Sequence, residues 1–94
     1  MPRRVRRHVV VHGHVQGVFF RGSTEEAATL AGVDGWVRNR RDGSVEAVFE
    51  GEPSAVARMV AFCRVGPSWA RVASVDVSEE PPEELRGFKI KRSG

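Results

Sequence analysis

Residues 15–21, with the sequence VQGVFFR, combine the residue types that bind a phosphoryl group. The stretch lies before a predicted helix, where backbone N–H groups lack intrahelical partners and the helix dipole adds positive potential. Gly17 allows the positive φ or close backbone approach that an anion-binding loop needs. Arg21 adds a planar guanidinium that matches phosphate oxygens. The alternative is a surface arginine paired with a carboxylate, of which Glu25 is the nearest in sequence. On these residues alone, both interpretations stay open.

Gln16 and Asn39 are the only side-chain amides in the chain. Depletion of thermolabile amides is typical of proteins from heat-adapted sources, so the two that remain stand out. Asn39 precedes Asp42-Gly43, where an asparagine is also a common turn former. Gln16 lies inside the stretch just described, and we expect it to hold the loop rather than to take part in chemistry.

The cysteine and the histidines do not form a pattern for covalent or metal chemistry. Cys63 is the only cysteine, which excludes an internal disulfide. It belongs to an apolar series at helical spacing, as a buried structural residue does: Val56, Met59, Val60 and Cys63. His12 and His14 form an H-x-H pair that could bind zinc, but no cysteine or nearby acidic residue completes the ligand set. We therefore expect no metal and no cofactor, while a role for His14 at the rim of the site stays open.

Periodicity and turn signals predict the elements that position these residues. The first half of the chain reads as a strand over 5–12, a loop over 13–17 and a helix over 23–31. Ser23 with Glu26 makes a capping box for this helix, and Gly32 is a C-terminal stop. A dipole directed at an anion requires the helix to begin earlier, near Arg21, and we favour that earlier start.

The second half of the chain alternates in the same way. It reads as strands over 36–40 and 44–50 around an Asp42-Gly43 hairpin turn, a helix from Pro53 to Gly66-Pro67, and strands around 73–77 and 88–90. Alternation on strand 44–50 predicts one buried face, with Val45 and Phe49, and a second face that is mostly wet, with Glu46 and Glu50.

The order β-α-β-β-α-β with a short closing strand predicts an α+β fold, the ferredoxin-like sandwich. In this fold an antiparallel sheet carries both helices on one face. A chain of 94 residues predicts a single domain over residues 1–94. No run of about 18 apolar residues is present, so we expect no membrane span and a cytoplasmic protein.

Several blocks of the sequence resemble the acylphosphatase family. They are His12–Arg21 (HGHVQGVFFR), Gly35–Asn39 (GWVRN), Asp42–Glu46 (DGSVE), and Gly66-Pro67 before Ala70–Val72 (ARV). The resemblance covers about residues 5–91, and VQGV-x-FR followed by GWV-x-N is much more specific than either part. A related domain begins large hydrogenase-maturation proteins, where a proline tends to follow the motif arginine. Gly22 follows it here, so we favour the free-standing enzyme.

The resemblance implies metal-independent hydrolysis of the carboxyl–phosphate bond of acyl phosphates. It implies that Arg21 and Asn39 are catalytic, and that the phosphate-binding loop comprises Val15, Gln16, Gly17, Val18, Phe19, Phe20 and Arg21. A carboxylate leaves without a general acid, so Arg21 and the loop amides would stabilise the phosphoryl charge and Asn39 would hold the attacking water. The expected partners are a small acyl phosphate and, as competitors, inorganic phosphate or sulfate.

The alternative is a non-catalytic RNA-binding module, because the RNA-recognition motif has the same element order and the chain has a net charge of +3. That module stacks bases on aromatic side chains of its first and third strands. The corresponding face of strand 44–50 carries Glu46, Val48 and Glu50, and carboxylates there would repel phosphates. We therefore expect no nucleic-acid partner.

Overall fold

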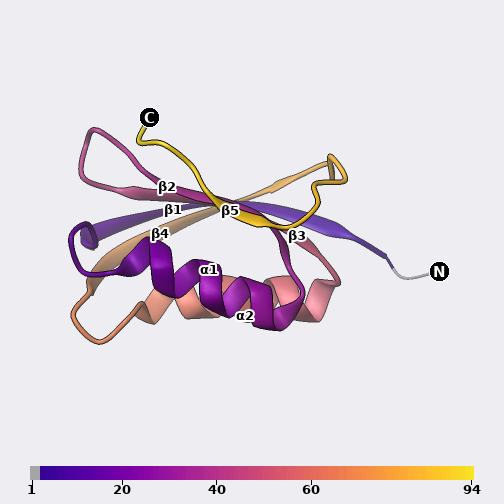
Figure 1. Cartoon of the computed structure of the whole chain (residues 1–94), viewed down its shortest axis with the longest axis horizontal. Coiled ribbons are helices and arrows are strands. Elements are labelled where there is room, and N and C mark those ends of the chain that lie inside the picture. The colour runs from indigo at the N-terminus through magenta and orange to yellow at the C-terminus, as the bar shows by residue number, and fades with distance from the viewer. Residues whose placement is uncertain (1–2) are drawn as a thin grey trace.

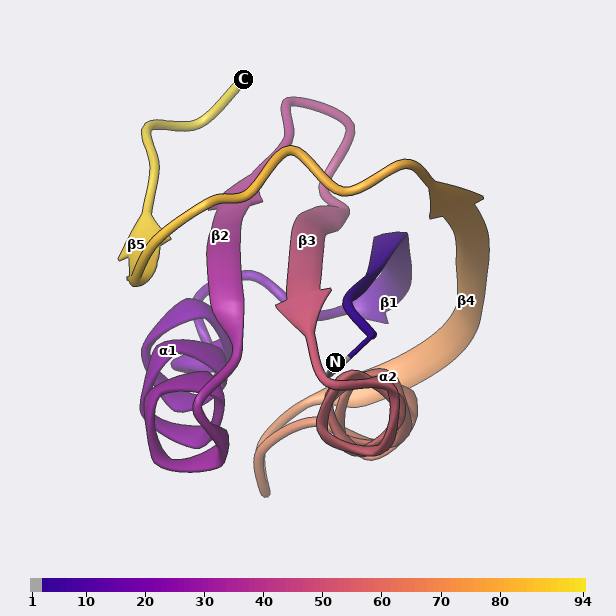
Figure 2. The ribbon, with the colours of Figure 1, turned by 90° about the vertical axis from the view of Figure 1, so that its right-hand side faces the viewer.

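A computed structural model describes residues 3–94 and arranges them in two layers, a sheet and a pair of helices (Figure 1). The elements are β1 (Val5–His14), α1 (Phe20–Ala31), β2 (Asp34–Asn39), β3 (Val45–Gly51), α2 (Pro53–Val65), β4 (Arg71–Glu80) and β5 (Phe88–Ile90). Both helices cover the same face of the sheet (Figure 2). The predicted ferredoxin-like order and layering are confirmed. None of the helices in the described part of the chain is long and apolar enough to cross a membrane.

The sheet has the strand order β4-β1-β3-β2-β5. The first four of these pair antiparallel, whereas β5 pairs parallel with β2, which makes the sheet mixed. Since β1 and β2 are both antiparallel to β3, they run in the same direction and end at the same edge. Val45 of β3 faces Val11 of β1 and Asn39 of β2. The loop after β1 therefore begins close to the end of β2.

One apolar core lies between the sheet and the helices. The inward faces of β1, β2 and β3 contribute side chains with no exposed surface, and the helices add others that are at most 4% exposed: Val9, Val11, Val37, Val45, Ala47 and Phe49, with Phe20, Ala28, Ala55, Val56, Met59 and Cys63. The alternation predicted for strand 44–50 is confirmed on this face. Burial of a side chain of this kind stabilises the fold by about 1.5–3 kcal/mol.

The other face of β3 is not wet, and that part of the prediction was wrong. Glu50 has no exposed surface, because Arg6 Nη1 donates to its Oε2 at 2.7 Å and the backbone N–H groups of Glu83 and Leu85 donate to its two oxygens at 2.8 and 3.0 Å. These bonds hold the segment 81–87, which crosses from one edge of the sheet to the other on the side away from the helices (Figure 2). A charged residue is buried here because its ionised oxygens are fully paired.

The N-terminus of α1 confirms the earlier helix start and contradicts the capping box. The helix begins at Phe20, its N-cap residue is Phe19, and no side chain caps it. Ser23 already lies inside the helix, where its N–H donates to the carbonyl of Phe19 at 3.0 Å. The predicted stop is confirmed, because Gly32 adopts a left-handed conformation with φ 70° and its N–H bonds back to the last turn.

Candidate functional site

The loop between β1 and α1 is anchored at both ends by buried apolar side chains. Val15 is 1% exposed, and Phe20 is 2% exposed and packs edge-to-face on Phe62 with ring centroids 6.2 Å apart. Between these anchors, Gly17 and Phe19 adopt positive φ values of 76° and 63°. The chain therefore reverses sharply and enters α1 with the first N–H groups of the helix without intrahelical partners.

Gln16 ties this loop to the hairpin between β2 and β3. Its side-chain Nε2 donates to the carbonyl oxygens of Arg40 and Ser44 at 2.7 and 2.8 Å. Those two residues close the hairpin, since the N–H of Arg40 donates to the carbonyl of Ser44 at 2.9 Å. Gln16 thus uses both donors of its amide to fix the loop beside the end of β2, which matches the structural role expected from the sequence.

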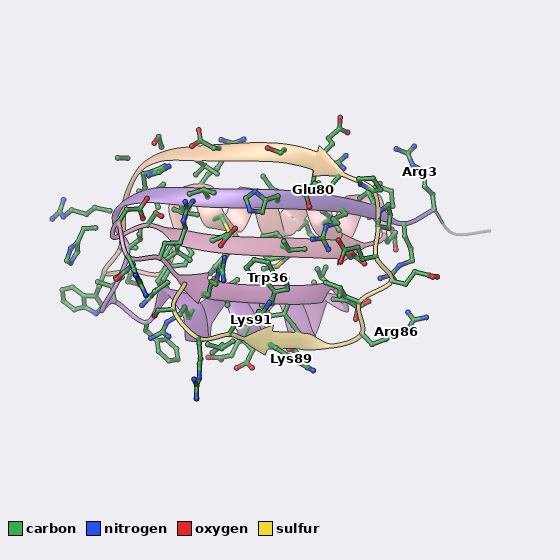
Figure 3. The ribbon with its side chains drawn as sticks, turned by 90° about the horizontal axis from the view of Figure 1, so that it is seen from above. Arg3, Trp36, Glu80, Arg86, Lys89 and Lys91 are labelled. Atoms are coloured by element: carbon green, nitrogen blue, oxygen red, sulfur yellow. The ribbon has the colours of Figure 1, made fainter. Side chains whose placement is uncertain are left out.

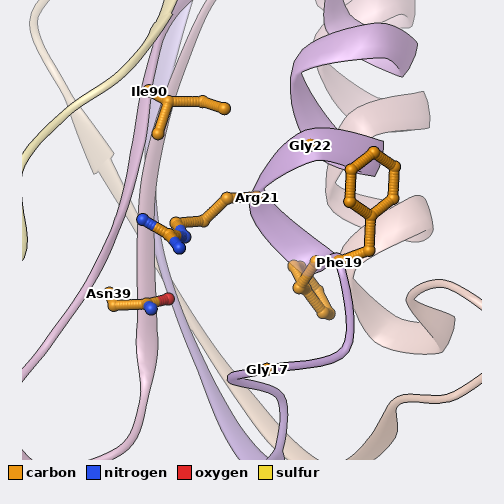
Figure 4. A pocket seen from close by; sticks show the side chains of 7 residues that line it. Gly17, Phe19, Arg21, Gly22, Asn39 and Ile90 are labelled. Carbon is orange, nitrogen blue, oxygen red and sulfur yellow. The ribbon is translucent and has the colours of Figure 1, made fainter.

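Arg21 and Asn39 meet across a cavity of about 380 Å³ at this edge of the sheet. Figure 4 shows the guanidinium of Arg21 extending from the first turn of α1 toward the amide of Asn39, with Gly17 below them. The cavity is lined by Gly17, Phe19, Phe20, Arg21, Gly22, Asn39 and Ile90. The site therefore combines a helix N-terminus, a fixed cation and a neutral amide.

The guanidinium of Arg21 has no carboxylate partner among residues 3–94. The ion pairs of this part of the chain involve other arginines and two histidines, and Glu25 is not among their partners. Within the described residues, the side-chain hydrogen bonds also include neither Arg21 nor Asn39. A cation placed at the positive end of a helix dipole without a partner is suited to an anionic ligand.

Asn39 is held by its backbone on both sides. It pairs with Val45 on β3, and its carbonyl oxygen accepts a hydrogen bond of 3.0 Å from the N–H of Gly94, beyond β5. These contacts fix the end of β2, so the amide projects into the cavity from a rigid strand rather than from a flexible turn.

The structure brings together most, not all, of the predicted site residues. Gly17, Phe19, Phe20, Arg21 and Asn39 line the cavity, whereas Val15, Gln16 and Val18 support the loop from outside it. His14 lines a different cavity together with Ser68, Trp69, Ala70 and Arg71. The sequence did not indicate Ile90 as a cavity residue, since its place depends on the parallel pairing of β5 with β2.

Cys63, His8 and His12 have structural roles. Burial raises the pKa of the Cys63 thiol to about 12, so this thiol stays protonated near neutral pH. His8 Nε2 lies 2.6 Å from a Glu46 carboxylate oxygen, and His12 Nε2 lies 3.1 Å from Asp76. Residues 3–94 contain no group of three or more His, Cys, Asp or Glu side chains that could hold a metal ion.

Comparison with known proteins gives a consistent result. A family profile described as acylphosphatase matches residues 7–90. The chain is 55% identical to an acylphosphatase of Gloeobacter violaceus over 99% of its length and 100% of that protein, and 59% identical to one of Roseiflexus sp. over 96% and 98%. The structure superposes on that of an acylphosphatase from Coxiella burnetii with a TM-score of 0.90 at 35% identity, over 94% and 93% of the two chains. It is also similar to 12% of a full-length HypF chain, with a TM-score of 0.91 at 26% identity.

Proposed function

We propose that Arg21 and Asn39 catalyse, without a metal ion, the reaction of the family to which this chain belongs. That family is acylphosphatase, and the chain hydrolyses acyl phosphates to a carboxylate and inorganic phosphate. The observation that carries this proposal is the arrangement at the cavity. An arginine that has no carboxylate partner among residues 3–94 and a side-chain amide meet there beside a helix N-terminus. The RNA-binding alternative finds no support in the comparisons.

The phosphoryl group binds at the N-terminus of α1. The backbone N–H groups from Gly17 to Arg21 donate hydrogen bonds to its oxygens, and the guanidinium of Arg21 donates to a further oxygen pair. Phosphoryl transfer develops charge on these oxygens, so a fixed cation and fixed amides stabilise the transition state without reorganising. Arg21 thereby fills the electrostatic role that a divalent metal has in many phosphoryl-transfer enzymes.

Asn39 positions the attacking water in line with the leaving carboxylate. An amide is not a base at neutral pH, so the proton of the water passes to a phosphoryl oxygen of the substrate. The leaving group has a conjugate acid of pKa about 4, and it departs as the carboxylate without a proton donor. Catalysis on this scheme comes from position and electrostatics.

Hydrolysis of benzoyl phosphate in excess EDTA tests metal independence, and Asn39→Ala tests the division of roles. We expect the wild-type rate to be unaffected by EDTA. In Asn39→Ala we expect turnover to fall about 10²–10³-fold, as for loss of one transition-state hydrogen bond. The inhibition constant of inorganic phosphate should change little, because Arg21 and the loop amides remain.

Two results would contradict these roles. Near-normal turnover of Asn39→Ala would remove Asn39 from the mechanism, and a loss of phosphate affinity with an unchanged unfolding midpoint would make it a binding residue. Loss of activity in EDTA that added Mg²⁺ restores would refute metal independence.

A further inference from the structure

The cavity has an apolar side that the phosphoryl group does not use. Phe19 and Ile90 both line it, and these residues are 67% and 42% exposed. Figure 4 shows them on opposite sides of the first turn of α1, with Gly22 between them. The cavity volume of about 380 Å³ falls in the range of small-molecule sites, about 300–1,000 Å³, and is larger than a phosphoryl group needs.

Phe19, which lines this cavity, has an unfavourable backbone conformation. Its φ is 63°, in the left-handed region, where a residue with a side chain is destabilised by about 1–2 kcal/mol. The ring gains little burial in return, because two thirds of its surface is exposed. A strained, exposed aromatic residue at the edge of a site is better explained by a ligand than by folding.

Gly22 makes room for this ring. A Cβ atom on Gly22 would collide with the ring carbons of Phe19. With glycine there, the ring lies against the first helical turn.

Ile90 forms the opposite wall and is held by backbone pairing. It lies beside Val37 in the β2–β5 ladder, and the N–H of Lys91 donates to the carbonyl of Val37 at 2.9 Å. The strand on the other side of β2 carries Val45 beside Asn39. Ile90 is therefore fixed relative to the proposed catalytic amide.

We propose that Phe19, Gly22 and Ile90 bind the acyl group of the substrate and select aromatic or branched aliphatic acyl phosphates over acetyl phosphate. This inference rests on the proposed placement of the phosphoryl group at Arg21. An acyl group bonded through oxygen to a phosphorus held there extends out of the anion site, and an aromatic ring or branched chain reaches the two apolar side chains. The methyl group of acetyl phosphate is too short to contact both.

The test compares kcat/KM for benzoyl phosphate and acetyl phosphate in the same preparations. Ile90→Ser removes one wall, and Phe19→Asn removes the other while keeping a residue that tolerates a positive φ. We expect the benzoyl-to-acetyl ratio to fall about tenfold in each, as for loss of hydrophobic contacts in a specificity pocket. Ile90→Leu keeps an apolar side chain, so it should retain most of the benzoyl-to-acetyl ratio.

Leu30→Ser is the matched control. Leu30 is an exposed apolar residue, 90% exposed, on α1 but away from this cavity. Its replacement should leave kcat/KM for both substrates, and therefore their ratio, unchanged. An unchanged ratio in Ile90→Ser and Phe19→Asn would overturn the proposal.

A binding experiment separates this proposal from the proposed function. Benzylphosphonate and methylphosphonate are stable probes, and calorimetry gives their affinities without turnover. The proposal requires wild-type protein to bind benzylphosphonate more tightly, and Ile90→Ser to lose that preference. Equal affinities in the wild type would overturn it. If neither acyl phosphate is hydrolysed, the proposed function fails, and the two phosphonates still decide whether the apolar subsite exists.

Discussion

Replacing Gln16 with methionine tests whether the anion loop and Asn39 act as one unit. Methionine has a similar length but cannot donate a hydrogen bond, so the variant loses both bonds to the carbonyl oxygens of Arg40 and Ser44. These bonds join the loop that carries Arg21 to the hairpin that follows Asn39. We expect lower stability and, separately, a lower rate for each folded molecule.

The loss of stability can be estimated from the partners that remain. The carbonyl of Ser44 keeps the bond from the N–H of Arg40, and the carbonyl of Arg40 keeps one from the N–H of Gly43 at 3.2 Å. Neither acceptor is left unpaired, so two ordinary hydrogen bonds are lost, together about 1–3 kcal/mol. For a domain of this size that lowers the unfolding midpoint by about 5–20 °C.

The effect on rate follows from geometry. A displacement of about 1 Å between groups that act on the same substrate reduces turnover about 10²-fold. We therefore expect kcat to fall by one to two orders of magnitude, with a smaller change in phosphate inhibition, because the loop keeps Arg21 and its amides.

Thermal unfolding, benzoyl phosphate turnover and phosphate inhibition on one preparation check this prediction. Ser54→Ala is a suitable control, since it removes a side-chain hydrogen bond of 2.6 Å to Glu52 at the exposed start of α2. The coupling between the anion loop and Asn39 would be refuted if Gln16→Met had a lowered unfolding midpoint but normal turnover at a temperature where it is folded. Gln16 would then be a stabilising residue only.

Three further predictions concern other residues. Arg21→Lys keeps a charge but loses the planar fork, so phosphate should inhibit more weakly and turnover should fall; wild-type phosphate affinity would place the anion elsewhere. Cys63→Ala should lower the free energy of unfolding by about 1 kcal/mol through a small cavity and leave turnover intact, whereas lost activity with a normal midpoint would indicate a thiol mechanism. Burial opposes ionisation of Glu50, but hydrogen bonds from the Glu83 N–H, Arg6 and the Leu85 N–H outweigh it and hold its pKa below the ordinary 4.5. The unfolded state therefore binds a proton at Glu50 more readily than the folded state does, so the free energy of unfolding decreases as pH falls below about 4.5. Unfolding midpoints measured over a pH series should depend less on acid pH in Glu50→Gln than in the wild type.

Much of the site could be predicted because it depends on local pattern and strand direction. The motif that ends in Arg21 is contiguous. Asn39 was singled out by the resemblance to the acylphosphatase family, and the element order places it near the motif, since the first and second strands of this fold end at the same edge. The start of α1 was predictable from the function expected of it, although the Ser23 capping box indicated a later start. Burial of the Phe20 ring outweighed that local capping preference.

The remainder depended on contacts between distant parts of the chain. Glu50 reads as a surface residue, and only Arg6, 44 residues away, and the N–H groups of the 81–87 segment make its burial possible. Ile90 enters the cavity because β5 pairs parallel with β2, and such pairing across 53 residues, as between Gly35 and Phe88, leaves no periodic signal in either strand. Phe19 was expected only as part of the phosphate-binding loop, and nothing in the sequence indicated its left-handed conformation, with φ 63°.

The hydrogen bond between Gly94 and Asn39 has a practical consequence for handling the protein. A peptide tag or a surface linkage joined at residue 94 would pull directly on the strand end that carries the proposed catalytic amide. The start of β1 lies at the far end of the sheet, ten residues or about 30 Å of extended strand from the phosphate loop (Figures 1 and 3). Affinity tags, fluorophores and immobilisation chemistry therefore belong before β1, where they leave the cavity and its geometry undisturbed.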